Sequence, residues 1–208
     1  MKCALKAFDI DPDKLDIVIF QLVRLYRNGE IARMSKRTGR AISLDDLLEE
    51  VGRDAARFFF NTKASGSHLD FDLDLAVKKS NENPVYYVQY AYARSCSMLR
   101  LLESEGFKVP DVDSVDLTVL KAPEEIELMK KLSEYPEEIR ISAQTLEPSR
   151  LTRYVLDVAS NFHSFYNACR VKGEEENLMY ARMILVDSTR LVIKNVLDVL
   201  SITAPEKM

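Results

Sequence analysis

Apolar residues recur at helical spacing over most of the second half of the chain. Steps of three and four positions separate them, so each set occupies one face of a helix. The three sets are Val88, Ala91, Ser95, Leu99 and Leu102; Leu151, Val155, Val158, Phe162, Phe165 and Cys169; and Leu178, Ala181, Leu185, Ser188, Val192, Val196 and Val199. They predict long amphipathic helices that bury their apolar faces against one another.

Helix boundary signals divide this region further. Asn83 followed by Pro84 is typical of a helix start, and Gly106 of a helix end. Pro123 begins a segment with acids in its first turn and lysines in its last, and Tyr135-Pro136 begins another. We therefore expect about four to five helices, packed as an antiparallel bundle over residues 80–208.

The first part of the chain has a mixed pattern. The apolar run Ile17–Phe20 and the residues that follow it lead into Asn28-Gly29, a hairpin signal, so we expect a strand, a turn and a short strand. Ser43 then predicts a capped helix that ends at Gly52, followed by a second helix over 53–63 and a loop over 65–76. A fully apolar strand belongs in a larger sheet than residues 1–79 supply, which indicates truncation.

Composition narrows the functional classes. A formal net charge of -4 disfavours unspecific wrapping of nucleic acid by the whole surface. Three cysteines without CxxC spacing and two histidines, one of them His68 beside Asp70 and Asp72, give no disulfide framework and no metal site. The sequence shows no long apolar run and no signal peptide, so we expect a cytoplasmic protein without a membrane partner. Against this acidic background, residues 24–40 are strongly basic.

Aromatic and basic side chains on the predicted helices are candidates for binding RNA. Tyr86, Tyr90 and Arg94 lie at i, i+4 and i+8 and therefore share one helix face, suited to unstacked bases and a phosphate. Tyrosines at this spacing also serve as core residues, and Gln89 either contacts a base edge or caps a neighbour. Three cations are candidates for a phosphate-facing strip, with a solvated face as the alternative: Arg182, Arg190 and Lys194.

Several segments resemble a known family. "RMSKRTGRAISLDDLLEEVGRDAARFFF" resembles the signature loop and following helices of class I aminoacyl-tRNA synthetases, specifically the bacterial arginyl-tRNA synthetases. "SHLDFDLDLA", "SNENPVYYVQYAYARSCSMLR", "FHSFYNACRV" and "APEKM" resemble later segments of that family, in the same order. The resemblance covers essentially the whole chain.

The resemblance implies a mainly α fold, in which the truncated end of an α/β catalytic domain with a β-hairpin (residues 1–79) precedes an all-helical anticodon-binding domain (80–208). The implied ATP loop is Arg33, Met34, Ser35, Lys36 and Arg37, with Lys36 as the catalytic cation that stabilises the ATP phosphates. Arg33 and Arg37 depart from the family's Lys and Ser. The implied tRNA-binding residues are Tyr86, Gln89, Tyr90, Arg94, Tyr166 and Met208; from spacing alone, Tyr166 also suits the core.

The implied function is that of an arginine–tRNA ligase, which joins L-arginine to tRNA(Arg) with ATP and Mg²⁺. The chain contains no His-x-Gly-His segment and no first half of the nucleotide-binding sheet, so we expect it to bind tRNA(Arg) without activating arginine alone. We expect a monomer, with a dimer through the exposed strand left open. The alternative is a stand-alone helical module for protein interaction or dimerisation.

Overall fold

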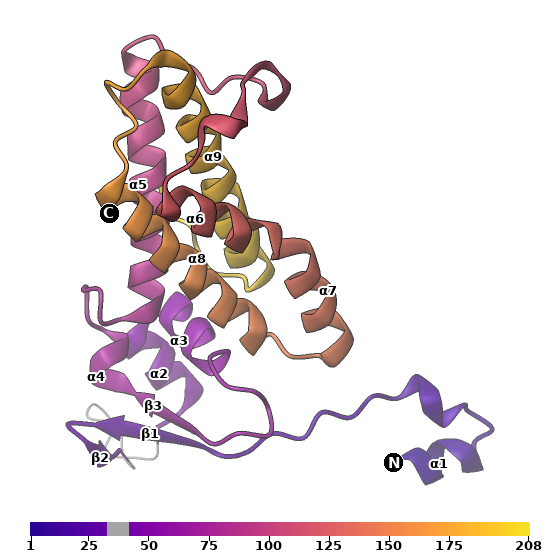
Figure 1. Cartoon of the computed structure of the whole chain (residues 1–208). Helices are drawn as coiled ribbons and strands as arrows, with labels where there is room; N and C mark the ends of the chain where they lie inside the picture. Colours follow the sequence, from indigo (N-terminus) through magenta and orange to yellow (C-terminus); the bar gives the residue numbers. More distant parts are fainter. Residues whose placement is uncertain (33–41) are drawn as a thin grey trace.

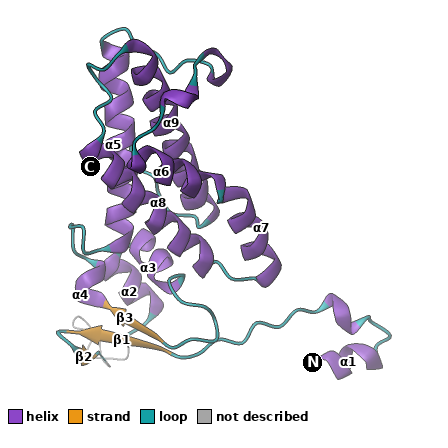
Figure 2. Cartoon of the chain, in the orientation of Figure 1, coloured by secondary structure: helices purple, strands orange, loops and turns teal. Residues whose placement is uncertain are grey.

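Most of the chain is helical, and a small sheet lies at one end of the helices (Figures 1 and 2). The computed structural model describes residues 1–32 and 42–208. The helices are α1 (Lys2–Ala7), α2 (Leu44–Val51), α3 (Arg53–Phe60), α4 (Leu73–Ala76), α5 (Pro84–Ser104), α6 (Pro123–Ser133), α7 (Tyr135–Thr145), α8 (Ser149–Ala168) and α9 (Glu176–Val199), with short 3₁₀ turns η1 (Pro12–Lys14), η2 (Val112–Ser114) and η3 (Leu117–Val119).

The sheet has the strand order β2-β1-β3. β1 (Val23–Arg27) pairs antiparallel with β2 (Glu30–Ile31) and parallel with β3 (Leu69–Asp72). Asn28 and Gly29 join β1 to β2 and have positive φ angles of 52° and 77°, as a tight hairpin turn requires. The predicted hairpin is confirmed.

Two predictions for the first part of the chain are wrong. Ile17–Phe20 is not a strand: β1 begins only at Val23, and Ile19 and Phe20 are 77 % and 74 % exposed. In Figure 1 this segment and α1 extend away from the rest of the chain. Residues 65–76 are not only a loop either, because they include β3 and α4. β3 forms by pairing with the distant β1, which local composition does not reveal.

The two predicted short helices form, although α3 ends at Phe60 and not at residue 63. Ser43 accepts from the Asp46 amide at 3.1 Å, and the Asp46 carboxylate accepts from the Ser43 amide at 3.1 Å, which is a reciprocal capping box. Gly52, with φ of 81°, separates α2 from α3. Phe58 and Phe59 on α3 are buried and fix this pair of helices beneath the bundle.

The bundle is centred on α8, which contacts α5, α6, α7 and α9. Its apolar stripe is buried along its whole length, as predicted, and Phe162 and Phe165 are completely inaccessible. Burial of each such side chain contributes roughly 1.5–3 kcal/mol. The structure confirms three predicted first residues of helices: Pro84, Pro123 and Tyr135.

A buried ion pair joins α6 to α9. Arg182 Nε donates to Glu125 Oε1 at 2.6 Å, and the Glu125 side chain is 1 % exposed. The second Glu125 oxygen accepts from the Ala122 amide at 2.7 Å, at the start of α6. Arg182 is therefore not part of a phosphate-facing strip, because its partner lies inside the bundle. The other two candidates of that strip pair within α9: Arg190 with Asp187, both part-buried, and Lys194 with the exposed Asp198.

Candidate nucleic-acid interface

A row of tyrosines occupies one face of α5. The rings of Tyr86 and Tyr90 lie 6.3 Å apart with an interplanar angle of 12°, so they are nearly parallel. Both side chains are half-buried, neither enclosed in the core nor fully in water. The helical spacing thus places the two rings on a shared face, as expected.

Arg94 links this row to α8. Its Cζ lies 4.9 Å from the Tyr90 ring centroid and 4.1 Å from that of Tyr166, so the guanidinium lies between two rings from different helices. Each such contact stabilises by about 0.5–1 kcal/mol when partly exposed. Among the described residues, no carboxylate forms an ion pair with Arg94, so the ring contacts orient its N–H groups and leave them free to donate.

His163 lies behind the tyrosine row. Its ring is 4.7 Å from the Tyr87 ring and 5.9 Å from the Tyr90 ring. Burial lowers the pKa of His163, and the nearby Arg94 charge lowers this pKa further, whereas a hydrogen bond with the Tyr87 backbone opposes them. His163 is therefore neutral near pH 7. Its buried Nε2 has no hydrogen-bond partner in the described part of the chain, so its polar capacity is only partly satisfied.

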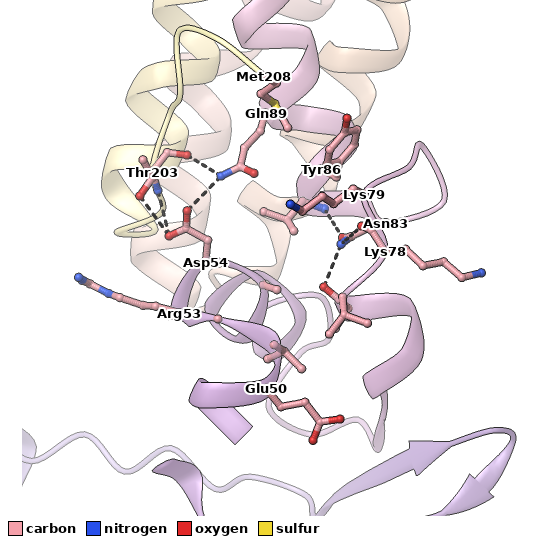
Figure 3. A pocket seen from close by; sticks show the side chains of 16 residues that line it. Glu50, Arg53, Asp54, Lys78, Lys79, Asn83, Tyr86, Gln89, Thr203 and Met208 are labelled. Carbon is pink, nitrogen blue, oxygen red and sulfur yellow. Dashed lines mark hydrogen bonds between the residues drawn. The ribbon is translucent and has the colours of Figure 1, made fainter. Parts of the chain in front are cut away.

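The segment after α9, residues 200–208, is tied back to earlier helices. Gln89 Nε2 donates to the Thr203 carbonyl at 2.8 Å and to Asp54 Oδ2 at 3.1 Å. The Thr203 amide donates to Asp54 Oδ1 at 3.2 Å, and Arg100 Nη2 donates to the Glu206 carbonyl at 2.7 Å. Figure 3 shows the contacts around Asp54. Gln89 thus binds its own chain through its amide nitrogen, as the neighbour-capping alternative expected.

Two cavities open on this face. One, of about 760 Å³, is lined by Tyr90, Arg94, Tyr166 and Met208 among others. The other, of about 820 Å³, is lined by Tyr86, Gln89 and again Met208 (Figure 3). Met208, 52 % exposed, therefore stands between them. The two cavities are lined by all six side chains that the family resemblance implied for tRNA binding.

The sequence missed three residues of this face. Asp54, Thr203 and Arg100 hold residues 200–208 against α5, and Asp54 and Thr203 lie 149 positions apart in the chain. No local pattern signals such contacts. Residues 200–208 contribute mainly backbone groups to these bonds, the Thr203 amide and carbonyl and the Glu206 carbonyl, so their residue types give no hint.

Three other points of the sequence analysis concern the ATP loop, metal ligands and membrane-spanning helices. Arg33, Met34, Ser35, Lys36 and Arg37 lie outside the described residues. Within residues 1–32 and 42–208, no group of three or more His, Cys, Asp or Glu side chains is placed to hold a metal ion. Among the helices of the same residues, none combines the length and apolar character needed to cross a membrane.

The comparisons with known proteins define the class of this chain. Residues 88–208 match the DALR anticodon binding domain, so the chain belongs to that family. Over all 208 residues it is 76 % identical to an arginine–tRNA ligase of Ruminiclostridium cellulolyticum. The family resemblance inferred from the sequence is confirmed.

Two solved structures support the same class by their fold. The fold matches a protein described as an arginyl-tRNA synthetase from Campylobacter jejuni with a TM-score of 0.86 and 29 % identity, over 100 % of this chain and 44 % of that one. It matches the Thermus thermophilus arginyl-tRNA synthetase with a TM-score of 0.73 and 26 % identity, over 91 % of this chain and 35 % of that one. The mainly helical fold class is thereby confirmed. The chain spans 37 % of the length of the Ruminiclostridium relative.

Proposed function

We propose that this chain is the C-terminal portion of an arginine–tRNA ligase and that it binds tRNA(Arg) through the anticodon. The longer protein would join L-arginine to tRNA(Arg) with consumption of ATP, assisted by Mg²⁺, in the cytoplasm. The chain would contribute to two domains: residues 1–79 would complete the catalytic domain, and residues 80–208 would form the anticodon-binding domain. The relatives named above support this assignment.

One observation carries the tRNA-binding role: Arg94 is clamped between Tyr90 and Tyr166 at the edge of an open cavity. An anticodon loop presents unstacked bases next to phosphates, and it needs aromatic faces beside N–H donors. Tyr90 and Tyr166 supply the faces, and Arg94 supplies oriented donors that no carboxylate of the described chain neutralises. Met208 would close the base-binding cavity from the side.

The ATP loop would act in the longer protein. Lys36 would place its ammonium group on the ATP phosphates and stabilise the charge that develops when arginine is activated. Arg33, Met34, Ser35 and Arg37 would complete that loop. Alone, this chain would not form arginyl-adenylate, because it lacks a His-x-Gly-His segment. Arginine-dependent exchange of pyrophosphate into ATP by the 208-residue chain would contradict this part.

The tRNA role is tested by equilibrium binding of the chain to tRNA(Arg) and to the same tRNA with an altered anticodon, at fixed moderate salt. We expect tighter binding of the unaltered tRNA. Tyr166→Ala should weaken it about 5- to 150-fold, since stacking contributes roughly 1–3 kcal/mol per base. Tyr180→Ala is the matched control: Tyr180 packs edge-on against Phe107 and lines neither cavity.

Equal affinity for both tRNAs, unaffected by Tyr166→Ala, would refute the proposal.

One observation favours the alternative of an interaction or dimerisation module: Phe8, Ile19 and Leu22 are 77 %, 77 % and 81 % exposed. We expect a monomer. A dimer that dissociates on Phe20→Ser, together with no preference for the anticodon, would support the alternative instead.

A further inference from the structure

The larger cavity is the one next to α3, and it adjoins the cavity that is lined by Tyr90, Arg94 and Tyr166. It has a volume of about 820 Å³ and is bounded by the start of α3, the segment before α5, and residues 203 and 208 (Figure 3). Cavities that hold nucleotide-sized ligands fall in the range of roughly 300–1,000 Å³. Its lining includes a half-buried aromatic ring, Tyr86, and an exposed ammonium group, Lys79.

The charges around this cavity do not cancel. Its two side-chain carboxylates differ: Glu50 pairs with Arg27 Nη2 at 2.6 Å, whereas Asp54 accepts hydrogen bonds from neutral groups of Gln89 and Thr203 and keeps its charge. In contrast, Lys79 forms no ion pair with any described residue. Arg53 lines the cavity as well and forms no ion pair with a described residue either. The lining side chains are thus three cations, Arg53, Lys78 and Lys79, against two carboxylates, so their summed charge is positive, which suits an anion.

The neighbouring Lys78 has a different environment. Its Nζ donates to Glu82 Oε2 at 2.5 Å, so its charge is already paired. In Figure 3 the Lys78 side chain extends away from the cavity, whereas Lys79 points toward the space between Tyr86 and Gln89. Two adjacent lysines thus differ in direction and in pairing.

The two cavities are neighbours that share one lining residue. Tyr86 is stacked on Tyr90, whose ring belongs to the first cavity, and Met208 lines both. A strand of RNA held at Tyr90, Arg94 and Tyr166 therefore has a surface of the same character on which to continue, with the next ring about 6.3 Å away.

We propose that this cavity is a second nucleotide subsite, in which Tyr86 stacks on one unpaired ribonucleotide of the bound tRNA and Lys79 contacts its phosphate. The inference rests on the proposed function, because it extends the path of the same RNA strand. A phosphate contact carries no base information, so Lys79 adds affinity for any anticodon, whereas the first cavity discriminates.

The test compares Lys79→Gln with Lys78→Gln, two variants with the same net charge and adjacent positions. Affinities of the 208-residue chain for tRNA(Arg) and for the altered-anticodon tRNA are measured over a series of salt concentrations. Lys79→Gln should weaken both complexes by the same factor, about fivefold at 0.1 M salt, and reduce the slope of log affinity against log salt by about 0.7. Lys78→Gln should change affinity less than twofold.

If the two lysine variants behave alike while Tyr166→Ala still weakens binding, the second subsite is refuted and the proposed function stands. A loss on Lys79→Gln that is confined to the unaltered tRNA also refutes it, because base readout would then replace a phosphate contact. If the unsubstituted chain does not distinguish the two tRNAs and Tyr166→Ala has no effect, the proposed function fails and the inference fails with it.

Discussion

Replacing Glu125 with Ala removes the acceptor from the buried ion pair that joins α6 to α9. The substitution deletes a hydrogen bond of 2.6 Å from Arg182 and one of 2.7 Å from the Ala122 amide. It leaves a guanidinium, with only 10 % of its side chain exposed, without its main partner. Arg182 is still near Glu174, at 3.5 Å, and that carboxylate is 36 % exposed.

The expected cost follows from this geometry. Removal of one partner from a buried ion pair typically lowers the free energy of unfolding by about 3–5 kcal/mol, chiefly because a buried charge loses its compensation. Glu174 supplies part of that compensation, so we expect the lower end, about 3 kcal/mol. For a chain of this size, that corresponds to a fall in Tm of roughly 6–12 °C.

Thermal unfolding followed by circular dichroism measures this effect, with Glu127→Ala as the control on the same helix. Glu127 pairs with Lys130 at 2.8 Å, but both side chains are more than half exposed, at 61 % and 65 %. Its loss should cost less than about 1 kcal/mol. Replacing Glu125 and Arg182 together by Met should restore most of the lost stability, because no unpaired charge then remains buried. Equal Tm losses for Glu125→Ala and Glu127→Ala would refute the reasoning.

Three further predictions concern a cap, a turn and a titrating side chain. Asn83→Ala should lower the free energy of unfolding, measured by urea titration, by about 2–3 kcal/mol. The reason is that the buried Asn83 side chain accepts from the Val85 amide and donates to two backbone carbonyls. Asn83→Ser should recover only the hydrogen bond that caps α5. Leu146→Gly should raise the Tm, since exposed Leu146 ends α7 in a left-handed conformation (φ 56°) that costs about 1 kcal/mol without glycine; an unchanged or lower Tm would contradict this. The lowered pKa of His163 means that the unfolded chain binds its proton more readily, so this residue contributes stability above its ordinary pKa of about 6.5 and loses it as the pH falls below that value. The Tm of the unsubstituted chain should therefore fall more steeply from pH 7 to 5 than that of His163→Phe, and parallel curves would contradict the assignment.

Much of the helical part could be predicted because its signals are local. Asn83 and Pro84 fix the start of α5 through the residues' own backbone preferences, and Gly52 separates α2 from α3 in the same way. The stripe from Leu151 to Cys169 is buried because helical geometry places those side chains on one face. These features depend on neighbours within four or five positions, which the sequence displays directly.

The sheet and the candidate interface depend on partners that are distant in the chain. β3 exists because β1 pairs with it, and Ile17–Phe20 stays exposed because the described residues supply no neighbour to cover it. The spacing of Tyr86, Tyr90 and Arg94 indicated a shared face. It did not indicate that Tyr166 would complete a clamp around Arg94.

The sequence by itself determined where most helices of the bundle begin, which faces they bury and which family they resemble, because these properties follow from local periodicity, caps and motifs. Only the tertiary structure decided that Arg182 is buried against Glu125, that Gln89 and Asp54 hold residues 200–208, and that Met208 separates two cavities. Those outcomes depend on which polar groups meet when the helices pack, since each buried donor or acceptor must find a partner across the fold.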